Sequence, residues 1–76
     1  MFEKEIIEKI LKKVKPSANL NNVSDIIDGG YLDSLELLGL ITSLMEEFGI
    51  EIEIEDISPE NFNSVEAMAD LVKRLK

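Results

Sequence analysis

Three segments of the chain place apolar residues at the three- and four-residue spacing of an amphipathic helix, and only one short segment alternates like a strand. The spacing predicts helices over residues 2–14, over about 34–48, and from Asn63 onward. The predicted core faces consist of Phe2, Ile6, Ile7, Ile10, Leu11 and Val14; of Leu37, Leu40, Ile41, Leu44 and Phe48; and of Val65, Met68, Ala69, Val72 and Leu75. A lone strand has no partner for its backbone hydrogen bonds. The pattern therefore predicts an all-α fold, a small four-helix bundle with three longer helices and one short one, in a single domain over residues 1–76.

The short helix and the last helix are both preceded by start signals. In "SPENF", Ser58 is the predicted N-cap and Pro59 the first helical residue, a position where proline is favoured. Asn63 is the predicted N-cap of the last helix, with Glu66 three residues later as its capping-box partner. These signals place two helix starts within a few residues of each other.

The strand-like segment is "IEIEIED", residues 50–56, which follows Gly49, a residue suited to a left-handed helix end. We expect an extended crossing whose isoleucines enter the helical core; edge-to-edge pairing in a dimer is the alternative. A weak Ca²⁺ or Mg²⁺ site on its acids is a further alternative, although the glycine-containing loop of an EF-hand is missing. The acids concerned are Glu51, Glu53, Glu55 and Asp56. We expect no resident metal.

A long connection over residues 16–32 shows no clear periodicity. Loops of this length are uncommon inside compact domains unless they are functional or held in place. The side chains expected to hold it are Leu20, Val23, Ile26, Ile27 and Leu32. The turn signal Asp28-Gly29-Gly30 predicts that the chain reverses just before Asp33 and Ser34.

The composition argues for a binding or carrier module rather than an enzyme. The chain has no cysteine and no histidine, so disulfides, thiolate metal sites and the usual general base at neutral pH are missing. No targeting segment and no membrane span is recognisable, and we expect a cytoplasmic monomer. The lysines of residues 2–14 are mixed with acids, which disfavours the alternative of a helix on a membrane surface.

The negative charge is concentrated in the middle of the chain. Residues 16–63 contain eleven acids and no base, and the net charge of the 76 residues is −8. Nucleic acid is a poor partner for such a surface, whereas a protein with a basic patch is a good one. The simpler interpretation is that the acids keep a small protein in solution.

Ser34 stands where the predicted turn becomes the second helix. Asp33 and Ser34 together are typical of helix capping. At about 100° per residue, however, Leu35, Thr42 and Glu46 fall away from the core face of this helix. From the residues alone, capping and use of the hydroxyl by another protein both remain open, as does an unmodified acidic helical interaction module.

The segment "LDSLELLGLITSLMEEFGIEI", residues 32–52, and the order of helices around it resemble acyl carrier proteins, including peptidyl- and D-alanyl-carrier relatives. The resemblance covers nearly the whole chain and implies a bundle of the acyl-carrier type. It implies that a phosphopantetheinyl transferase attaches 4′-phosphopantetheine from coenzyme A to Ser34, with Asp33 in a supporting role. The arm then carries acyl groups as thioesters. This chain would have no catalytic residue of its own.

The resemblance also implies that the second helix is the docking face for acyl- or aminoacyl-activating ligases and acyl-processing enzymes with basic patches. The residues concerned are Leu35, Glu36, Leu38, Thr42, Glu46 and Glu47. Gly39, Thr42 and Met45 depart from the pattern of many fatty-acid carriers. The letters "SPENFNSV" are closer to carriers served by a dedicated adenylate-forming ligase. Cargo in fatty-acid, polyketide or related biosynthesis is the first expectation, and an amino acid is the alternative.

Overall fold

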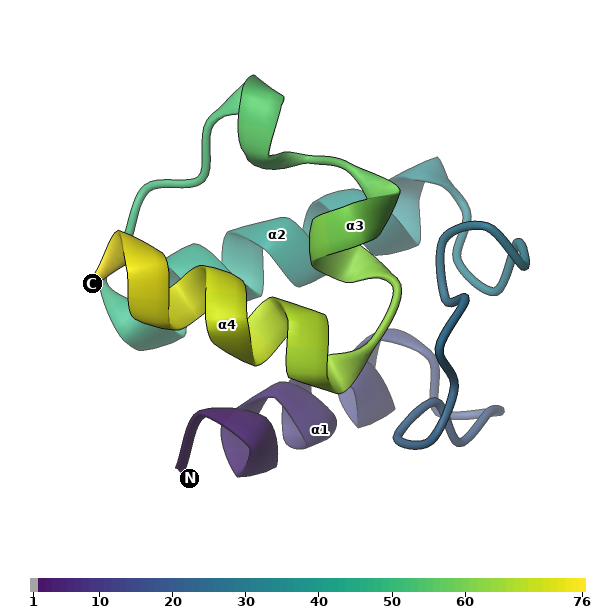
Figure 1. The fold of residues 1–76 in the computed structure, drawn as a ribbon. Helices are drawn as coiled ribbons and strands as arrows, with labels where there is room; N and C mark the ends of the chain where they lie inside the picture. The colour runs from purple at the N-terminus through teal and green to yellow at the C-terminus, as the bar shows by residue number, and fades with distance from the viewer. Residues whose placement is uncertain (1) are drawn as a thin grey trace.

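The computed structural model describes residues 2–76, except for the side chain of Phe2. Its elements are α1 (Phe2–Val14), α2 (Ser34–Phe48), a 3₁₀ helix η1 (Ile54–Asp56), α3 (Pro59–Phe62) and α4 (Val65–Leu75) (Figure 1). No strand occurs within residues 2–76. The predicted all-α bundle of three longer helices and one short one is therefore confirmed, and the bounds of the first two helices match the prediction.

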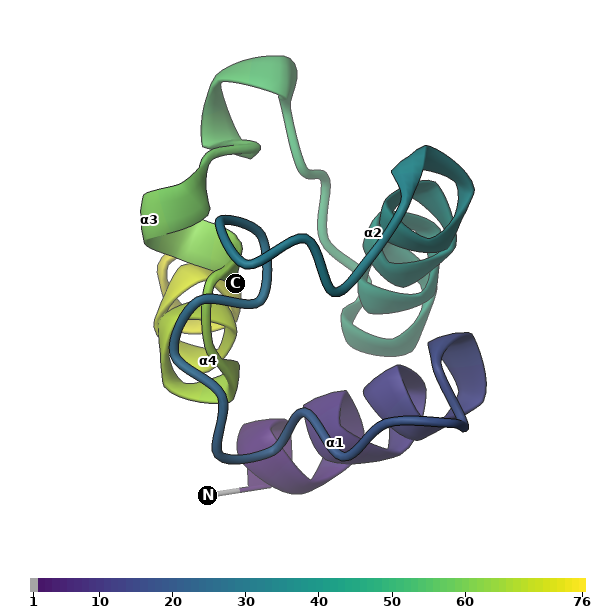
Figure 2. The same ribbon diagram turned by 90° about the vertical axis from the view of Figure 1, so that its right-hand side faces the viewer.

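The three long helices form the body of the bundle. In Figure 1, α2 and α4 both run from right to left, and α1 lies below them and runs the opposite way. Helix α1 packs against both α2 and α4, and α3 packs against α4. Figure 2 shows the same body from the side, with α1 lying beneath the ends of α4 and α2. The long connection runs past these ends and leads into α2.

The core contains most of the apolar residues predicted from helical spacing; the predicted core side chain of Phe2 lies outside the described part of the structure. Its buried members are Ile7, Ile10, Leu11, Leu20, Ile26, Leu40, Ile41, Leu44, Ile50, Phe62, Val65, Met68, Ala69, Leu71 and Val72. Leu37, Phe48 and Leu75 lie at its border and are partly buried, and Leu71 is a core residue that the prediction omitted. Within residues 2–76 no polar or charged side chain is buried. Apolar burial is therefore the main stabilising term of this fold.

The segment after α2 follows the prediction only in its first half. Gly49 ends the helix in the left-handed region, with φ +63°, and Ile50 is buried. Ile52 is partly buried, but Ile54 is 86% exposed, so the prediction that it enters the core was wrong. The reason is the 3₁₀ turn, in which the Glu53 N–H donates to Asp56 Oδ2 at 3.0 Å and the Ile57 N–H donates to the Ile54 carbonyl at 3.0 Å. The two-residue alternation ends where this turn begins.

The start of α4 lies one residue later than predicted. Ser64, not Asn63, is the N-cap, because its Oγ accepts a hydrogen bond from the Ala67 N–H at 3.0 Å. Glu66 does not return to close a capping box with Asn63; it forms an exposed ion pair with Lys4 at 3.2 Å. The prediction of Asn63 as the cap was wrong because two adjacent residues carried equivalent capping side chains.

Asn63 instead holds the long connection. Its Oδ1 accepts hydrogen bonds from the N–H groups of Ile27 at 2.9 Å and Asp28 at 3.1 Å. Its Nδ2 donates to Asp28 Oδ2 at 3.1 Å, and its carbonyl accepts from the Ile26 N–H at 2.9 Å. One residue at the junction of α3 and α4 thus satisfies three successive backbone N–H groups of a segment that lacks regular structure.

The apolar residues expected to hold the connection do so. Leu20 and Ile26 are buried, and Val23, Ile27 and Leu32 pack against the core. The chain then reverses at two glycines. A Cβ on Gly29 would lie 2.8 Å from the Asp25 carbonyl, and Gly30 has φ +72°, so each position requires glycine for a different reason.

Glu3 and Lys76 meet at one side of the bundle. Glu3 Oε2 accepts a hydrogen bond from Lys76 Nζ at 3.2 Å, and this ammonium lies 5.9 Å from the centre of the Phe48 ring. A backbone hydrogen bond at Glu3 is the largest cause that lowers the pKa of its carboxyl from 4.5 to about 2, and the Lys76 ammonium acts in the same direction. Lys76 therefore links the start of α1 to the end of α2.

None of the helices within residues 2–76 combines the length and the apolar character needed to cross a membrane.

The inner and outer faces of α2 can be compared by two leucine truncations. Leu40 is fully buried and Leu35 is 79% exposed. We expect Leu40→Ala to lower the free energy of unfolding by about 2–4 kcal/mol through lost burial and a residual cavity. Leu35→Ala should change it by no more than about 0.5 kcal/mol. Urea unfolding followed by circular dichroism measures both, and equal losses would contradict the assignment of the two faces.

The hold of Asn63 on the connection is tested by Asn63→Ala. The change leaves the N–H groups of Ile27 and Asp28 without their acceptor, so we expect a loss of about 1–2 kcal/mol in stability. Amide hydrogen exchange should accelerate at residues 26–28 more than elsewhere. Asn22→Ala is the control, because Asn22 is exposed and its side chain makes no hydrogen bond within residues 2–76. Unchanged exchange at residues 26–28 would contradict the role given to Asn63.

Candidate functional site

Asp33 and Ser34 lie where the turn enters α2. Asp33 is the N-cap, in an extended conformation, and its Oδ1 accepts a hydrogen bond from the Glu36 N–H at 2.8 Å. Ser34 is the first residue of the helix and is exposed. The capping role expected for this pair therefore belongs to Asp33 alone. The Ser34 hydroxyl is not used as a cap.

Glu36 supplies the second half of the capping at the start of α2. Its Oε1 accepts a hydrogen bond from the Asp33 N–H at 2.9 Å, which completes a reciprocal capping box. Lys15 Nζ lies 3.3 Å from each oxygen of the same carboxylate. Sequence reasoning placed Glu36 on the docking face and missed both contacts. The spacing of Asp33 and Glu36 was a readable signal for the capping box, whereas nothing in the sequence indicated Lys15.

The first turn of α2 keeps donors available for an anion. The N–H groups of Ser34 and Leu35 have no acceptor within residues 2–76, and the Ser34 hydroxyl makes no hydrogen bond there. Unpaired N–H groups and the helix dipole favour negative charge at this end of a helix. A phosphodiester on Ser34 would therefore lie beside the positive end of α2. The residues present fit a phosphopantetheine group attached at this position.

The outer face of α2 is apolar near Ser34 and acidic further along. Leu35 and Leu38 are 79% and 59% exposed, and Thr42, Glu46 and Glu47 are exposed as well. Of the six residues predicted for docking, five lie on the surface. Glu36 differs from them, because both of its oxygens are already engaged. Helix α2 carries no basic residue.

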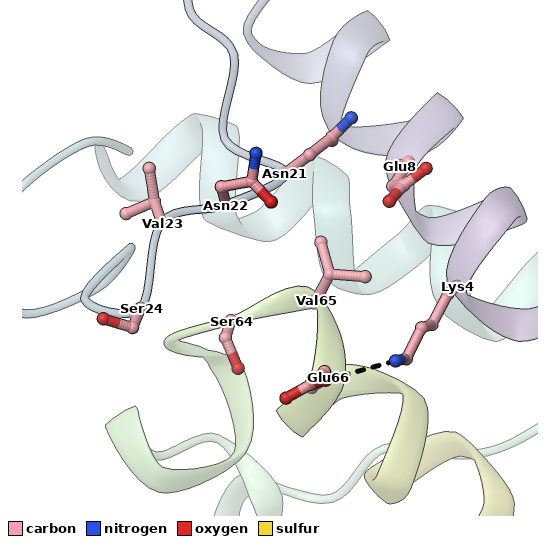
Figure 3. A pocket seen from close by; sticks show the side chains of 9 residues that line it. All are labelled: Lys4, Glu8, Asn21, Asn22, Val23, Ser24, Ser64, Val65 and Glu66. Atoms are coloured by element: carbon pink, nitrogen blue, oxygen red, sulfur yellow. Dashed lines mark hydrogen bonds and ion pairs between the residues drawn. The ribbon is translucent and has the colours of Figure 1, made fainter.

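The surface also has hollows that Ser34 does not line, and two of them differ clearly in character. A small apolar one of about 60 Å³ lies between the connection, α2 and α3, lined by Ile27, Leu37, Ile57, Ser58, Pro59 and Phe62. A polar one of about 340 Å³ lies between α1, residues 21–24 and the start of α4 (Figure 3). The Lys4–Glu66 ion pair lies at the polar hollow, and none of the residues that line this hollow belongs to the predicted site.

Across residues 2–76, no three acidic side chains are grouped so that they could hold a metal ion. The alternative of a cation site on residues 51–56 therefore has no support in the structure.

Comparison with known proteins gives one family model and two similar proteins, each matching most of the chain. The family model described as a phosphopantetheine attachment site matches residues 4–72. An acyl carrier protein of Buchnera aphidicola subsp. Schizaphis graminum (strain Sg) is 42% identical over 69 residues, which cover 91% of this chain and 82% of the relative. An acyl carrier protein of Buchnera aphidicola subsp. Baizongia pistaciae (strain Bp) is 34% identical over 74 residues, covering 90% of this chain and 92% of the relative.

These matches confirm the resemblance drawn from residues 32–52. The family model includes most of α1, all of α3 and most of α4, in agreement with the expectation that the resemblance covers nearly the whole chain. The chain therefore belongs to the acyl carrier protein family defined by the phosphopantetheine attachment site, and it is a carrier of that cofactor rather than an enzyme.

Proposed function

We propose that this chain carries acyl groups as thioesters on a 4′-phosphopantetheine arm attached to Ser34 Oγ. The observation that carries the proposal is the exposed hydroxyl at the first position of α2, which, like the two N–H groups beside it, has no hydrogen-bond partner within residues 2–76. The two relatives are both named acyl carrier proteins, which supports acyl groups as the cargo.

Attachment needs a second protein. A bond forms between Ser34 Oγ and the phosphorus of the pantetheine phosphate, the pyrophosphate bond of coenzyme A breaks, and adenosine 3′,5′-bisphosphate leaves. The proton of the hydroxyl must pass to a base, because a neutral serine is a poor nucleophile. This chain has no histidine, so the base belongs to the transferase. The arm supplies the thiol that a cysteine-free chain cannot supply itself.

The partners proposed are a phosphopantetheinyl transferase, an acyl-activating ligase and acyl-processing enzymes. Leu35 and Leu38 offer apolar contacts near the attachment point, and Glu46 and Glu47 offer charge further along the same helix. A partner that fits this face has an apolar patch with basic residues beside it. The surface of residues 16–63 contains no base to oppose such a partner.

Attachment at Ser34 is tested by intact mass. We expect the chain to gain one phosphopantetheine when it is incubated with a transferase, coenzyme A and Mg²⁺, and Ser34→Ala to abolish the gain. Ser43→Ala is the matched control, because Ser43 lies on the same helix but further from its start. An unchanged wild-type mass, with a transferase shown to modify another carrier, would refute the proposal.

The cargo is tested on the modified chain. Acyl-activating and aminoacyl-activating ligases are supplied in parallel, and thioester formation is followed by mass and by release with hydroxylamine. The proposal predicts loading with fatty acyl groups. Loading with an amino acid alone would favour the aminoacyl alternative and leave the attachment site intact.

Docking on α2 is tested by reversing charges. We expect the double variant Glu46→Lys and Glu47→Lys to raise the KM of the transferase about ten-fold, since each exposed charge contact contributes up to about 1 kcal/mol. The kcat should change little, because neither residue lies near Ser34 in the helix. Glu5→Lys with Asp70→Lys gives the same change in net charge on α1 and α4 and serves as control. Equal effects of the two double variants would show that net charge, not this face, governs recognition.

A further inference from the structure

We propose that Glu36 and Lys15 form a positioning pair that orders the first turn of α2 for modification of Ser34, and that Glu36 is not a docking acid. This inference rests on the proposed attachment at Ser34. It assigns Lys15, a residue of the α1–α2 junction, to the function of a serine 19 positions further along the chain.

The pair joins the end of one helix to the start of the next. Lys15 continues the backbone of α1, because its N–H donates to the Leu11 carbonyl at 2.8 Å. Its ammonium reaches both oxygens of Glu36 at 3.3 Å, and Glu36 Oε1 also accepts from the Asp33 N–H at 2.9 Å. The Glu36 carboxylate is therefore bound both by the backbone N–H of Asp33, just before Ser34, and by Lys15 at the end of α1.

The first turn of α2 needs this support. It follows a reversal through Gly29 and Gly30, residues that lose more conformational freedom on folding than any other type. Among residues 2–76, the Ser34 hydroxyl and the N–H groups of Ser34 and Leu35 have no hydrogen-bond partner that would fix them. Leu32 and Leu37 pack against the core on either side of this turn, and the capping box and the ion pair are the polar contacts that add to its orientation. A pre-oriented nucleophile reacts faster because less orientation is lost on reaching the transition state.

The geometry disfavours a docking role for Glu36. Its side chain is 25% exposed, and both oxygens are engaged by a group of the opposite charge. A basic residue of a partner would have to displace Lys15 before it could bind. Glu46 and Glu47 are exposed and make no ion pair within residues 2–76. Glu47 lines a hollow with Lys9 and Lys13 of α1, so Glu46 is the acid that the same partner would meet without having to break an ion pair.

Four variants separate a positioning role of Glu36 from a docking role. Glu36→Gln keeps an acceptor for the Asp33 N–H but removes the ion pair. Glu36→Ala removes both contacts. Lys15→Met removes the ion pair from the other side, and Lys15→Arg restores it. Lys4→Met is the matched control, because it breaks the exposed Lys4–Glu66 pair on a different part of α1.

The measurements are kcat and KM for the transferase, and amide exchange at residues 33, 36 and 37, whose N–H groups are hydrogen-bonded in this turn. We expect Glu36→Gln and Lys15→Met each to lower kcat about three-fold with KM unchanged, and the double variant to equal either single one. Glu36→Ala should lower kcat about ten-fold, Lys15→Arg should restore it, and exchange at residues 33, 36 and 37 should accelerate in the same order. Lys4→Met should leave all of these values as in the wild type.

Two results would overturn the inference. A rise in KM for Glu36→Gln, with no loss for Lys15→Met, would show that Glu36 contacts the partner directly. Wild-type kinetics in every variant would show that the pair does not position Ser34. In both cases the wild-type chain is still modified, so the proposed function stands. Only a wild-type chain that gains no mass removes both proposals together.

Discussion

Burial of the inner face of α2 against α1, in a core that also contains side chains of α4, is the contact on which the rest of the structure depends. Leu40 and Leu44 are fully buried and Ile41 nearly so, and no disulfide, metal cluster or buried ion pair replaces them within residues 2–76. Each such side chain contributes about 1.5–3 kcal/mol by leaving water. Because this face must point inward, the helix can present only its other face to partners. Packing therefore determines which residues near Ser34 are accessible.

The helices and most of the core could be predicted because helical spacing is a local property of the sequence. The left-handed end at Gly49, the proline start at Pro59 and the Asp33 cap likewise depend on neighbours within one turn. The errors arose where a local pattern had two solutions. Alternation at residues 50–54 gave way to a 3₁₀ turn at Ile54, and the cap of α4 was assigned to Asn63 when the next residue also fitted it.

The contacts at the site that the sequence did not reveal are long-range in the chain. Lys15 meets Glu36 across 21 positions, and Asn63 meets Asp28 across 35. Neither pairing has a periodic signal, because each depends on how α1, α2 and the α3–α4 junction come together. The exposed position of Ser34 was predictable from its place before the core face of α2. The interactions that orient it were not.

The side-chain amide of Asn63 is a group whose chemical change would weaken the hold on the connection. Its amide acts as acceptor to the backbone and as donor to the Asp28 carboxylate at the same time. Spontaneous hydrolysis of that amide would create a carboxylate, which cannot donate at neutral pH and would repel its neighbour. The age of a single side chain, at the junction of α3 and α4, would then influence how firmly residues 26–28 are held, a few positions before the chain reaches Ser34.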